Sequence, residues 1–360
     1  MSRDWRLLRD GITDAHHHFA VEEALARLLA EGQSPPTLRL RQVRRAVFVG
    51  AFQDTWSEVD VDYCRANGIK IVRRANGGGA VYHDVGSFCF SAFFPRAGFS
   101  EGEEELYRLF AGPVIRTCAD YGIVGHYSGR NDVLVGGRKI YGSAQLAWYD
   151  AFVQSGTFLV NMDFGVMGRA LTPPAAKFAG KPLSSIQERV TSLAREVGRE
   201  LDTSAVMERF APNLGEMLGI SLTHGELTPQ EQALADELLA VKYGTDEWNL
   251  GVPLQHAITV AARTRGGVVS LSASLKEGIL GQVRIGGDCL VSRRADLDGL
   301  EQTLVGCTPT GARDLVQAGA VPADLRQALV GLLEELGREE MDQPIGMPQR
   351  QRQSPLGRKA

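Results

Sequence analysis

The stretch SGRNDVLVGGRKIYGSAQ at residues 128–145 contains a complete β-hairpin pattern. An apolar run at 133–135 is followed by the pair Gly136 and Gly137 and then by a second run at 139–144. Adjacent glycines readily adopt the positive φ angles of a tight hairpin turn, so the two runs are expected to pair as antiparallel strands. This hairpin is therefore predicted to lie within a central sheet.

Further strand patterns surround the hairpin, and helical patterns lie between them. The runs with strand character are residues 37–41, 46–50, 69–73, 88–94 and 157–162. The run at 88–94 is apolar without interruption, which is typical of a strand buried on both faces. Residues after Asp14 repeat apolar side chains at helical spacing, and a second helix is expected at 57–67, where Gly68 ends it. The alternation predicts an α+β fold around a mixed sheet.

The C-terminal third predicts a smaller α+β unit. Thr228, Pro229 and Glu231 form the signature of a helix start with a capping box, and this helix is expected to close the large domain. The elements expected beyond it are strands at 256–264, 268–275 and 279–285 and helices at 297–304 and 324–336. The expected organisation is a large domain at 1–248, a small accessory domain at 249–340 and a disordered tail at 341–360.

Composition excludes several classes of protein. The 360 residues carry a net charge of −4, so the chain lacks the basic field that holds nucleic acid, and no nucleic-acid partner is expected. No run approaches the roughly 20 apolar residues that cross a bilayer, and the N-terminus lacks a secretory pattern. A cytoplasmic protein without a membrane partner is therefore expected. The five cysteines lack C-x-x-C spacing, which argues against a disulfide framework and a zinc site.

A glycine-rich stretch, RRANGGGAVYHD at residues 73–84, directly follows a predicted strand. Its three successive glycines leave one side of the loop without side chains, so a phosphate or carboxylate can approach the backbone N–H groups. Arg73 and Arg74 add the positive charge that such a ligand needs. A tight structural turn would use the same glycines. The spacing matches neither a P-loop nor a dinucleotide-binding fingerprint.

Polar residues bracket the predicted hairpin. Asn131 and Asp132 are suited either to anchoring a magnesium ion or to orienting the backbone. Lys139 lies on the return strand, three residues before the small residues Gly142, Ser143 and Ala144. Its side chain points to the opposite face from its neighbours, and on a buried face it would need an anion. A lone lysine is more commonly exposed, but here it accompanies a glycine loop.

Taken together, these motifs resemble the lipoate-protein ligase A family, whose superfamily also contains biotin protein ligases and octanoyltransferases. The resemblance rests on RRANGGGAVYHD, GRNDVLVGGRKIYGSAQ, SGTFLVNMDF, AAKFAGKPLSSIQERVTSL and TDEWNLG, which occur in the family's order across residues 5–336. It implies the catalytic fold of that superfamily with a small accessory domain. The residues implied to bind nucleotide are Arg74, Gly77, Gly78, Gly79, Ala80, Val81, Tyr82, His83, Asn131, Asp132, Lys139, Gly142, Ser143 and Ala144.

The resemblance also implies a reaction. Lipoate and ATP would form lipoyl-AMP, and the lipoyl group would pass to a lysine of a carrier protein, with Lys139 as the catalytic residue in contact with both phosphate and carboxylate. Mg²⁺ would assist, with Asp132 as its candidate ligand. Residues 173–185, with Lys177 and Lys181, would form a mobile loop over the adenylate. Val81 and Ala144 would contribute apolar walls to the acyl pocket.

The partner implied by the resemblance is a lipoyl carrier protein. Three carriers remain open: the lipoyl domain of a 2-oxoacid dehydrogenase, the glycine cleavage carrier and a lipoyl carrier of sulfur metabolism. Family members are often monomers, so a monomer is expected. The sequence decides neither the carrier nor the choice between lipoate and octanoate.

Two rival functions remain. An octanoyl- or lipoyl-transferase of the same fold would use a cysteine thiolate in place of ATP, expected just before GRNDVLV, where residues 125–128 hold none. Cys89 and Cys118 lie in apolar runs and are interpreted as core residues. The second rival is a non-catalytic protein that binds lipoate or lipoylated carriers, but the lysine and the glycine loop are both present.

Two positions depart from the family pattern. The chain has Ser155 where the family commonly has a histidine before Gly-Thr, which removes one polar contact from the acyl pocket. His16, His17 and His18 are consecutive at the start of the first helix, where they would point in different directions. They are interpreted as a solvated helix start rather than a metal site.

Overall fold

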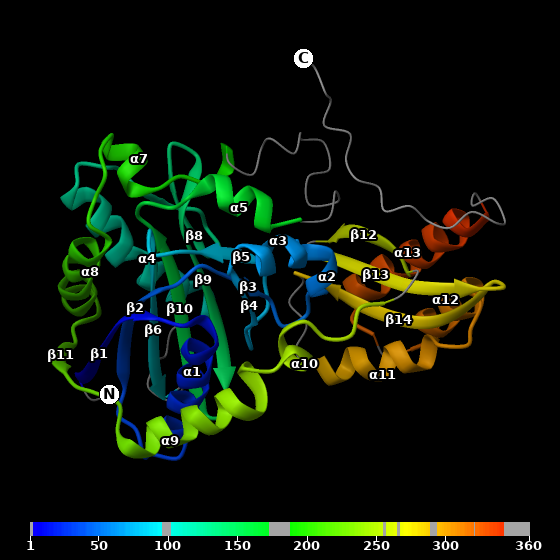
Figure 1. The fold of residues 1–360 in the computed structure, drawn as a ribbon, viewed down its shortest axis with the longest axis horizontal. Helices are drawn as coiled ribbons and strands as arrows, with labels where there is room; N and C mark the ends of the chain where they lie inside the picture. The colour runs from blue at the N-terminus through cyan, green and yellow to red at the C-terminus, as the bar shows by residue number, and fades with distance from the viewer. Residues whose placement is uncertain are drawn as a thin grey trace.

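An eight-stranded mixed sheet forms the centre of the larger, N-terminal part of the protein (Figure 1). The computed structural model describes residues 3–95, 102–172, 188–254, 257–264, 267–288, 294–319 and 321–341. The strand order is β11-β1-β2-β6-β10-β9-β8-β7. The strands are β1 (Asp4–Thr13), β2 (Thr37–Val43), β6 (Ser87–Pro95), β7 (His126–Tyr127), β8 (Asp132–Val135), β9 (Arg138–Trp148), β10 (Ala151–Leu159) and β11 (Ser221–His224). β1 runs parallel to β2 and β11, and the remaining pairs are antiparallel, which confirms the predicted mixed sheet.

Helices cover both faces of this sheet. The helices α4 (Glu103–Asp120) and α8 (Thr203–Leu218) pack on one face, and α1 (Ala15–Ala30) and α9 (Pro229–Leu238) pack on the other. In β6, Phe88 and Phe90 point toward α4 and α8, whereas Cys89 and Phe93 point toward α1. The predicted strand at 88–94 is therefore apolar throughout because each face packs on a helical layer.

A second sheet, in the order β4-β3-β5, carries the glycine-rich stretch. Its strands are β3 (Ala46–Val49), β4 (Lys70–Arg73) and β5 (Val81–His83). The single helix predicted at 57–67 is wrong, since two short helices, α2 (Thr55–Glu58) and α3 (Val61–Ala66), occupy this region. Val59 between them is extended and bridges to Leu171, and the Asp60 side chain accepts a hydrogen bond from the Tyr63 amide to start the second helix.

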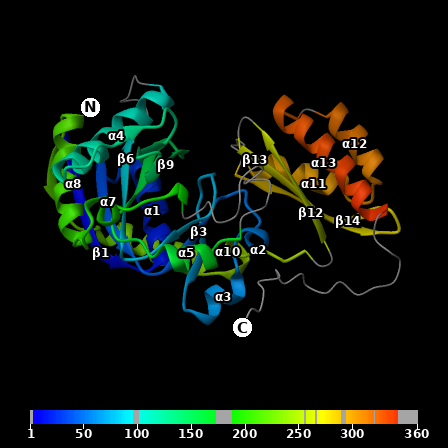
Figure 2. The same ribbon diagram turned by 90° about the horizontal axis from the view of Figure 1, so that it is seen from above.

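The C-terminal region forms a three-stranded sheet covered by helices, with a hydrophobic core of its own. Its elements are β12 (Ala257–Thr264), β13 (Gly267–Lys276), β14 (Ile279–Gly287), α11 (Arg294–Leu304), α12 (Pro309–Ala318) and α13 (Ala323–Met341). The strand predictions are confirmed, and α12 was not predicted. Phe52, from the loop after β3, packs into this core, and Arg284 pairs with Asp54 at 2.9 Å. Figure 2 shows the β12–β14 sheet beside that loop.

The connection between the two regions contains the predicted capping box. Thr228 and Glu231 each accept from the other's backbone amide, which starts α9 as expected. The helix does not continue to residue 240 as one α-helix, because the π-helix η3 (Leu239–Tyr243) follows, and then α10 (Asp246–Asn249). Short helices α5 (Phe164–Ala170) and α7 (Leu193–Val197) complete the described elements. No helix in the described ranges is long and apolar enough to span a membrane.

Candidate active site

A cavity of about 1280 Å³ lies along the α1 side of the central sheet. Its walls come from the glycine loop, β9, β10, β6, α1 and the β12–β14 sheet. The predicted site residues that line it are Arg74, Gly77, Gly78, Gly79, Ala80, Val81, Tyr82, His83, Asn131, Lys139, Gly142, Ser143 and Ala144. Two segments far apart in sequence, the glycine loop and the hairpin, thus face one space. Residues 173–185, the predicted adenylate loop, lie outside the described residues, as does the predicted tail beyond Met341.

Lys139 occupies an intermediate environment rather than either of the two extremes considered. Its side chain is 38% exposed, and Nζ lies 2.8 Å from Oδ1 of Asp132. The side chain lies across Gly142: a Cβ added there would come within 2.4 Å of the lysine Cε and Nζ. The absence of a Cβ at Gly142 therefore provides the space that the Lys139 ammonium group occupies. Asp132 is within reach of the site through this ion pair.

Asn131 holds the two hairpin strands together. Its Nδ2 donates to the Ser143 carbonyl at 2.7 Å, and its own carbonyl accepts from the Ser143 amide and Oγ, each at 2.9 Å. Of the two roles considered for Asn131, the contacts are those of a residue that orients the backbone. The bonds keep β8 and β9 in register beside Lys139.

Arg74 holds the glycine loop from within. Its guanidinium is buried and donates to the carbonyls of Phe48, Gly77 and Gly79 at 2.8–3.0 Å. Burial and the neighbouring charge of Arg73 lower the pKa of Arg74 to about 10, so the group stays protonated at neutral pH. A direct contact of Arg74 with nucleotide stays a prediction.

The loop also depends on Gly78, within the triplet, and on Gly50, which follows β3. Gly78 has φ of +95°, a conformation that L-residues with a Cβ rarely adopt. A Cβ on Gly50 would lie 2.0 Å from the Gly78 carbonyl oxygen, so the loop rests directly on the chain after β3. The glycines thus serve as a tight turn as well as leaving the cavity side open.

Arg73 differs from its expected role as a phosphate ligand. Its guanidinium donates to backbone carbonyls, including those of Trp248 at 3.0 Å and Gln53 at 2.7 Å. Its backbone amide donates to Oδ1 of Asn249 at 3.0 Å. The TDEWNLG motif therefore anchors the strand that leads into the glycine loop.

One row of paired residues crosses the sheet beneath the cavity. Arg41 of β2 is paired with Cys89 of β6, Cys89 with Thr157 of β10, and Thr157 with Gly142 of β9. Directly paired residues in a sheet point to the same face. Adjacent strands are about 4.8 Å apart, so three strand spacings separate Gly142 from Arg41 by about 14 Å. This cross-strand row links the Lys139 end of the cavity to a far end at Arg41.

Cys89 is a wall of the cavity rather than only a core residue, which corrects the sequence interpretation. Its Sγ lies 3.6 Å from Nδ1 of His83 and 3.7 Å from Oγ1 of Thr157. Burial raises the pKa of the Cys89 thiol. Burial, together with the charges of Arg74 and Arg41, lowers the pKa of His83 to about 3. The pair is therefore a neutral thiol beside a neutral imidazole at neutral pH.

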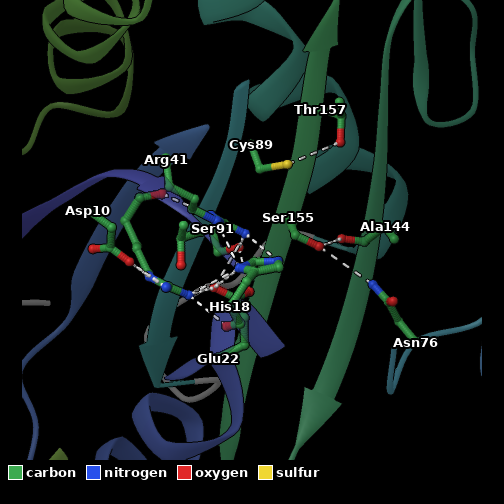
Figure 3. A network of polar contacts seen from close by, with 12 residues as sticks. Asp10, His18, Glu22, Arg41, Asn76, Cys89, Ser91, Ala144, Ser155 and Thr157 are labelled. Carbon is green, nitrogen blue, oxygen red and sulfur yellow. Dashed lines mark hydrogen bonds and ion pairs between the residues drawn. The ribbon is translucent and has the colours of Figure 1, made fainter. Parts of the chain in front are cut away.

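The far end of the cavity is polar, and sequence reasoning missed it. Figure 3 shows His18 and Glu22 of α1 meeting Arg41 of β2, and Ser91 accepts a hydrogen bond from Arg41 and donates one to Glu22. His18 is 1% exposed, so the solvated helix start predicted for the three histidines is wrong for this one. Burial and the neighbouring arginines lower the pKa of His18. The available signal was the alternation in TLRLRQV, which puts Arg39 and Arg41 on one face of a buried strand.

Further lining residues come from two unexpected places. Ser155, at the position where a histidine is usual, donates from Oγ to the Ala144 carbonyl at 3.3 Å and faces the cavity. From the C-terminal sheet, Arg263 and Asp288 also line it. Nothing in the local sequence around these two residues indicated a site, because their approach depends on how the C-terminal sheet packs beside the loop after β3.

Comparison with known proteins places this architecture in a family. Residues 14–215 match the lipoyl protein ligase A/B catalytic domain. The octanoyltransferase LipM of Symbiobacterium thermophilum is 30% identical over 69% of this chain and 99% of its own length. Lipoate–protein ligase 1 of Staphylococcus aureus is 29% identical over 83% of this chain and 88% of its own length. The chain belongs to the lipoyl protein ligase A/B family, whose ligases and transferases share this catalytic fold.

A solved structure supports the same assignment. The crystal structure of a lipoate-protein ligase A bound with ATP superposes with a TM-score of 0.60 at 29% identity, covering 69% of this chain and all of that one. The expected fold class, a mixed-sheet catalytic fold of lipoate ligases, is confirmed. Relatives of both activities are similarly close, so the family assignment leaves the choice between ligase and transferase to the chemistry of the site.

Proposed function

We propose that this protein is an ATP-dependent lipoate-protein ligase. It activates lipoate as lipoyl-AMP and transfers the lipoyl group to a lysine of a lipoyl carrier protein. The observation that carries the proposal is the position of Lys139, which lies over Gly142 at one end of the cross-strand row and shares the cavity with the glycine loop. A carboxylate and a phosphate can both reach one ammonium group there.

The proposed chemistry follows from these residues. The carboxylate of lipoate attacks the α-phosphate of ATP, and pyrophosphate leaves. Lys139 stabilises the negative charge that gathers on the phosphate, and the N–H groups of the glycine loop bind the same charge. In the second step the amine of the carrier lysine attacks the mixed anhydride and AMP leaves. No covalent bond to the enzyme forms.

The residues present fit a magnesium ion only as a partner of the nucleotide. The described residues contain no group of three His, Cys, Asp or Glu side chains that would hold a metal by themselves. Mg²⁺ commonly takes one or two carboxylates and completes its shell with phosphates and water. Asp132, which pairs with Lys139 at 2.8 Å, is proposed as its carboxylate ligand. When bound, the ion would neutralise phosphate charge during the first step.

The transferase alternative rests on Cys89, the one cysteine that lines the cavity among the described residues. A cysteine nucleophile must ionise, and the usual device is a nearby imidazolium or another positive charge. Here the thiol pKa is raised by burial and His83 stays neutral, so the pair does not favour a thiolate. This supports the adenylating reaction over acyl transfer through an enzyme thioester.

Lipoate-dependent exchange of pyrophosphate into ATP tests the proposal. A ligase catalyses this exchange, whereas a transferase or a protein that only binds lipoate does not. The Lys139→Ala variant should lose the exchange while keeping its fold by circular dichroism. The Cys89→Ala variant should retain it. Exchange that persists without Lys139, or an acyl-thioester on Cys89 detected by mass spectrometry, would contradict the proposal.

The carrier and the accessory region extend the proposal. We propose that residues 249–340 form an accessory domain beside the cavity, because Arg263 and Asp288 line it. The acceptor is proposed to be a lipoyl domain, a glycine cleavage carrier or a sulfur-metabolism carrier. Mass spectrometry of each carrier after incubation with enzyme, ATP, Mg²⁺ and lipoate would identify it by the added lipoyl mass. The enzyme is proposed to act as a monomer, which light scattering would check.

A further inference from the structure

The far end of the cavity is closed by a polar cluster that is buried except for the partly exposed Asp10. It is defined here as the end-wall cluster: Asp10, His18, Glu22, Arg39, Arg41 and Ser91. Of these, His18, Glu22 and Arg41 line the cavity, although each is less than 5% exposed. An acyl pocket that served only a hydrocarbon tail would be expected to end in apolar side chains. The polar end wall is therefore a feature that the proposed chemistry does not explain.

Within the end-wall cluster, Arg41 has more N–H donors than acceptors. Two guanidinium groups bring five N–H donors each. Arg41 donates from Nε to Nδ1 of His18 at 3.1 Å, and its Nη2 lies 3.2 Å from Nε2 of the same ring. A neutral imidazole accepts at one nitrogen only and carries a hydrogen on the other. Because Nδ1 accepts from Nε, the Nη2 contact with the ring sets donor against donor, and Nη2 is instead directed to Ser91 and Glu22. Nη1 donates to the Arg39 carbonyl, so one of the five N–H groups of Arg41 is left for a further acceptor.

The charges of the end-wall cluster are balanced. Arg39 pairs with Asp10 and, at 2.8 Å, with Glu22. Arg41 pairs with Glu22 at 3.3 Å. Two cations face two carboxylates, and His18 is neutral. A ligand that brought a further negative charge would be unpaired in this buried place, so the spare donor suits an uncharged acceptor.

The cross-strand row is long enough to accommodate an eight-carbon acid between Lys139 and Arg41. The row spans about 14 Å from Gly142 to Arg41. Eight carbons joined by bonds of about 1.5 Å extend over roughly 9 Å. The remaining about 5 Å between these backbone positions is covered by polar contacts and by the length of the Arg41 side chain, with Lys139 at the carboxylate and Arg41 at the distal end. An eight-carbon acid bound at Lys139 would therefore bring its far end to the end-wall cluster.

We infer that Arg41 and His18 form a selectivity wall that favours acids whose distal end is an uncharged hydrogen-bond acceptor, such as the ring sulfur of a dithiolane. A straight alkyl chain that ends in a methyl group covers the same N–H donor without bonding to it, and an unbonded buried donor opposes binding. Sulfur is a weak but polarisable acceptor. This inference rests on the proposed function for the class of acid, and it assigns lipoate over octanoate.

The test measures binding of free acids to the full chain, without nucleotide, by titration calorimetry. Three probes are used: lipoate, octanoate and octanedioate. The wild-type protein should bind lipoate at least about tenfold more tightly than octanoate. Equal affinity for the two, or tighter binding of octanedioate than of lipoate, would overturn the inference. This arm needs no variant.

The variant arm removes the wall and leaves Arg39 to pair with both carboxylates of the cluster, Asp10 and Glu22. In Arg41→Met, Glu22 keeps Arg39 at 2.8 Å and Ser91 at 2.6 Å, so the protein is expected to fold. The affinity ratio of lipoate to octanoate should fall to near one, mainly because octanoate binds more tightly. The matched control is Asp10→Asn, which changes a charge of the same cluster at a residue outside the cavity lining and should keep the wild-type ratio.

The two hypotheses fail separately. If pyrophosphate exchange is absent but the affinity ratio is present and lost in Arg41→Met, the proposed ligase reaction fails and the selectivity wall stands. If exchange proceeds but Arg41→Met keeps the wild-type ratio, the wall fails and the ligase reaction stands. A ratio that falls equally in Asp10→Asn would also refute the wall, because the effect would then belong to the cluster's net charge.

Discussion

Replacing Gly142 by alanine tests the position of Lys139 without touching its charge. The added methyl would lie 2.4 Å from both Cε and Nζ of Lys139, closer than non-bonded atoms approach. The atoms that must move are the end of a flexible side chain, so the lysine rather than the backbone is expected to shift. Its ion pair with Asp132 would be broken or displaced.

The expected changes in stability and activity differ in size. The pair of Lys139 and Asp132 is partly exposed, and after solvent screening such a pair is worth about 0–1 kcal/mol, so unfolding should change by less than about 1 kcal/mol. Loss of one aligned electrostatic group in an active site costs about 2.7–4 kcal/mol in the transition state, or roughly 100- to 1,000-fold in rate. Gly142→Ala should therefore be a stable protein with strongly reduced pyrophosphate exchange.

A double-mutant cycle checks that the effect passes through the lysine. Exchange is measured for Gly142→Ala, Lys139→Ala and the double variant, with Gly331→Ala as control because a Cβ there meets nothing within 4 Å. The double variant should be no slower than Lys139→Ala alone, since the methyl can displace a side chain only when it is present. Near-normal exchange in Gly142→Ala, or full additivity in the double variant, would refute the reasoning.

Three further predictions follow from the packing and the buried histidine. Gly156→Ala should lower the free energy of unfolding by about 1–3 kcal/mol in urea titrations, because its Cβ would lie 2.4 Å from the buried Tyr141 ring. Phe52→Ala should uncouple unfolding of the C-terminal region from that of the rest of the chain, because the Phe52 ring comes from the loop after β3 and packs into the C-terminal core. Calorimetry should then show two unfolding transitions that overlap less than in the wild type. The His83 pKa of about 3 lies below its ordinary value near 6.5, so the unfolded state binds the proton first and stability is lost as pH falls from about 6.5 toward 3. Urea titrations between pH 7 and 5 should show a shallower loss in His83→Gln than in wild type, by up to about 1.4 kcal/mol per pH unit, and no change in the exposed His224→Gln.

Local patterns predicted much of the fold. The hairpin glycines and the capping box at Thr228 act through neighbours in the chain, and both are confirmed. The helix at 57–67 was wrong because Val59 makes a bridge to Leu171, a residue more than a hundred positions away. Propensity does not contain such a contact, so it could not indicate where the helix breaks.

Identity of the site residues was more predictable than their roles. The sequence motifs identified residues that line the cavity, because a glycine-rich loop and a lysine beside strands are residue types suited to binding an anion. Arg73 was assigned to a ligand, whereas it anchors backbone carbonyls. Cys89 was interpreted as a core residue, which its burial confirms, but it also lines the cavity. The partner of a side chain depends on which strand lies beside it, and strands pair only when the chain folds.

The sequence by itself determined the family, the glycine loop and the lysine, because these depend on residue type and short spacing. Only the tertiary structure decided that Lys139 lies over Gly142 and that a row from Gly142 through Thr157 and Cys89 ends at Arg41. Strand order and register set that row, and both arise from long-range pairing. The polar end of the cavity, and with it the proposed choice of acid, exists only once β2 and α1 have packed together.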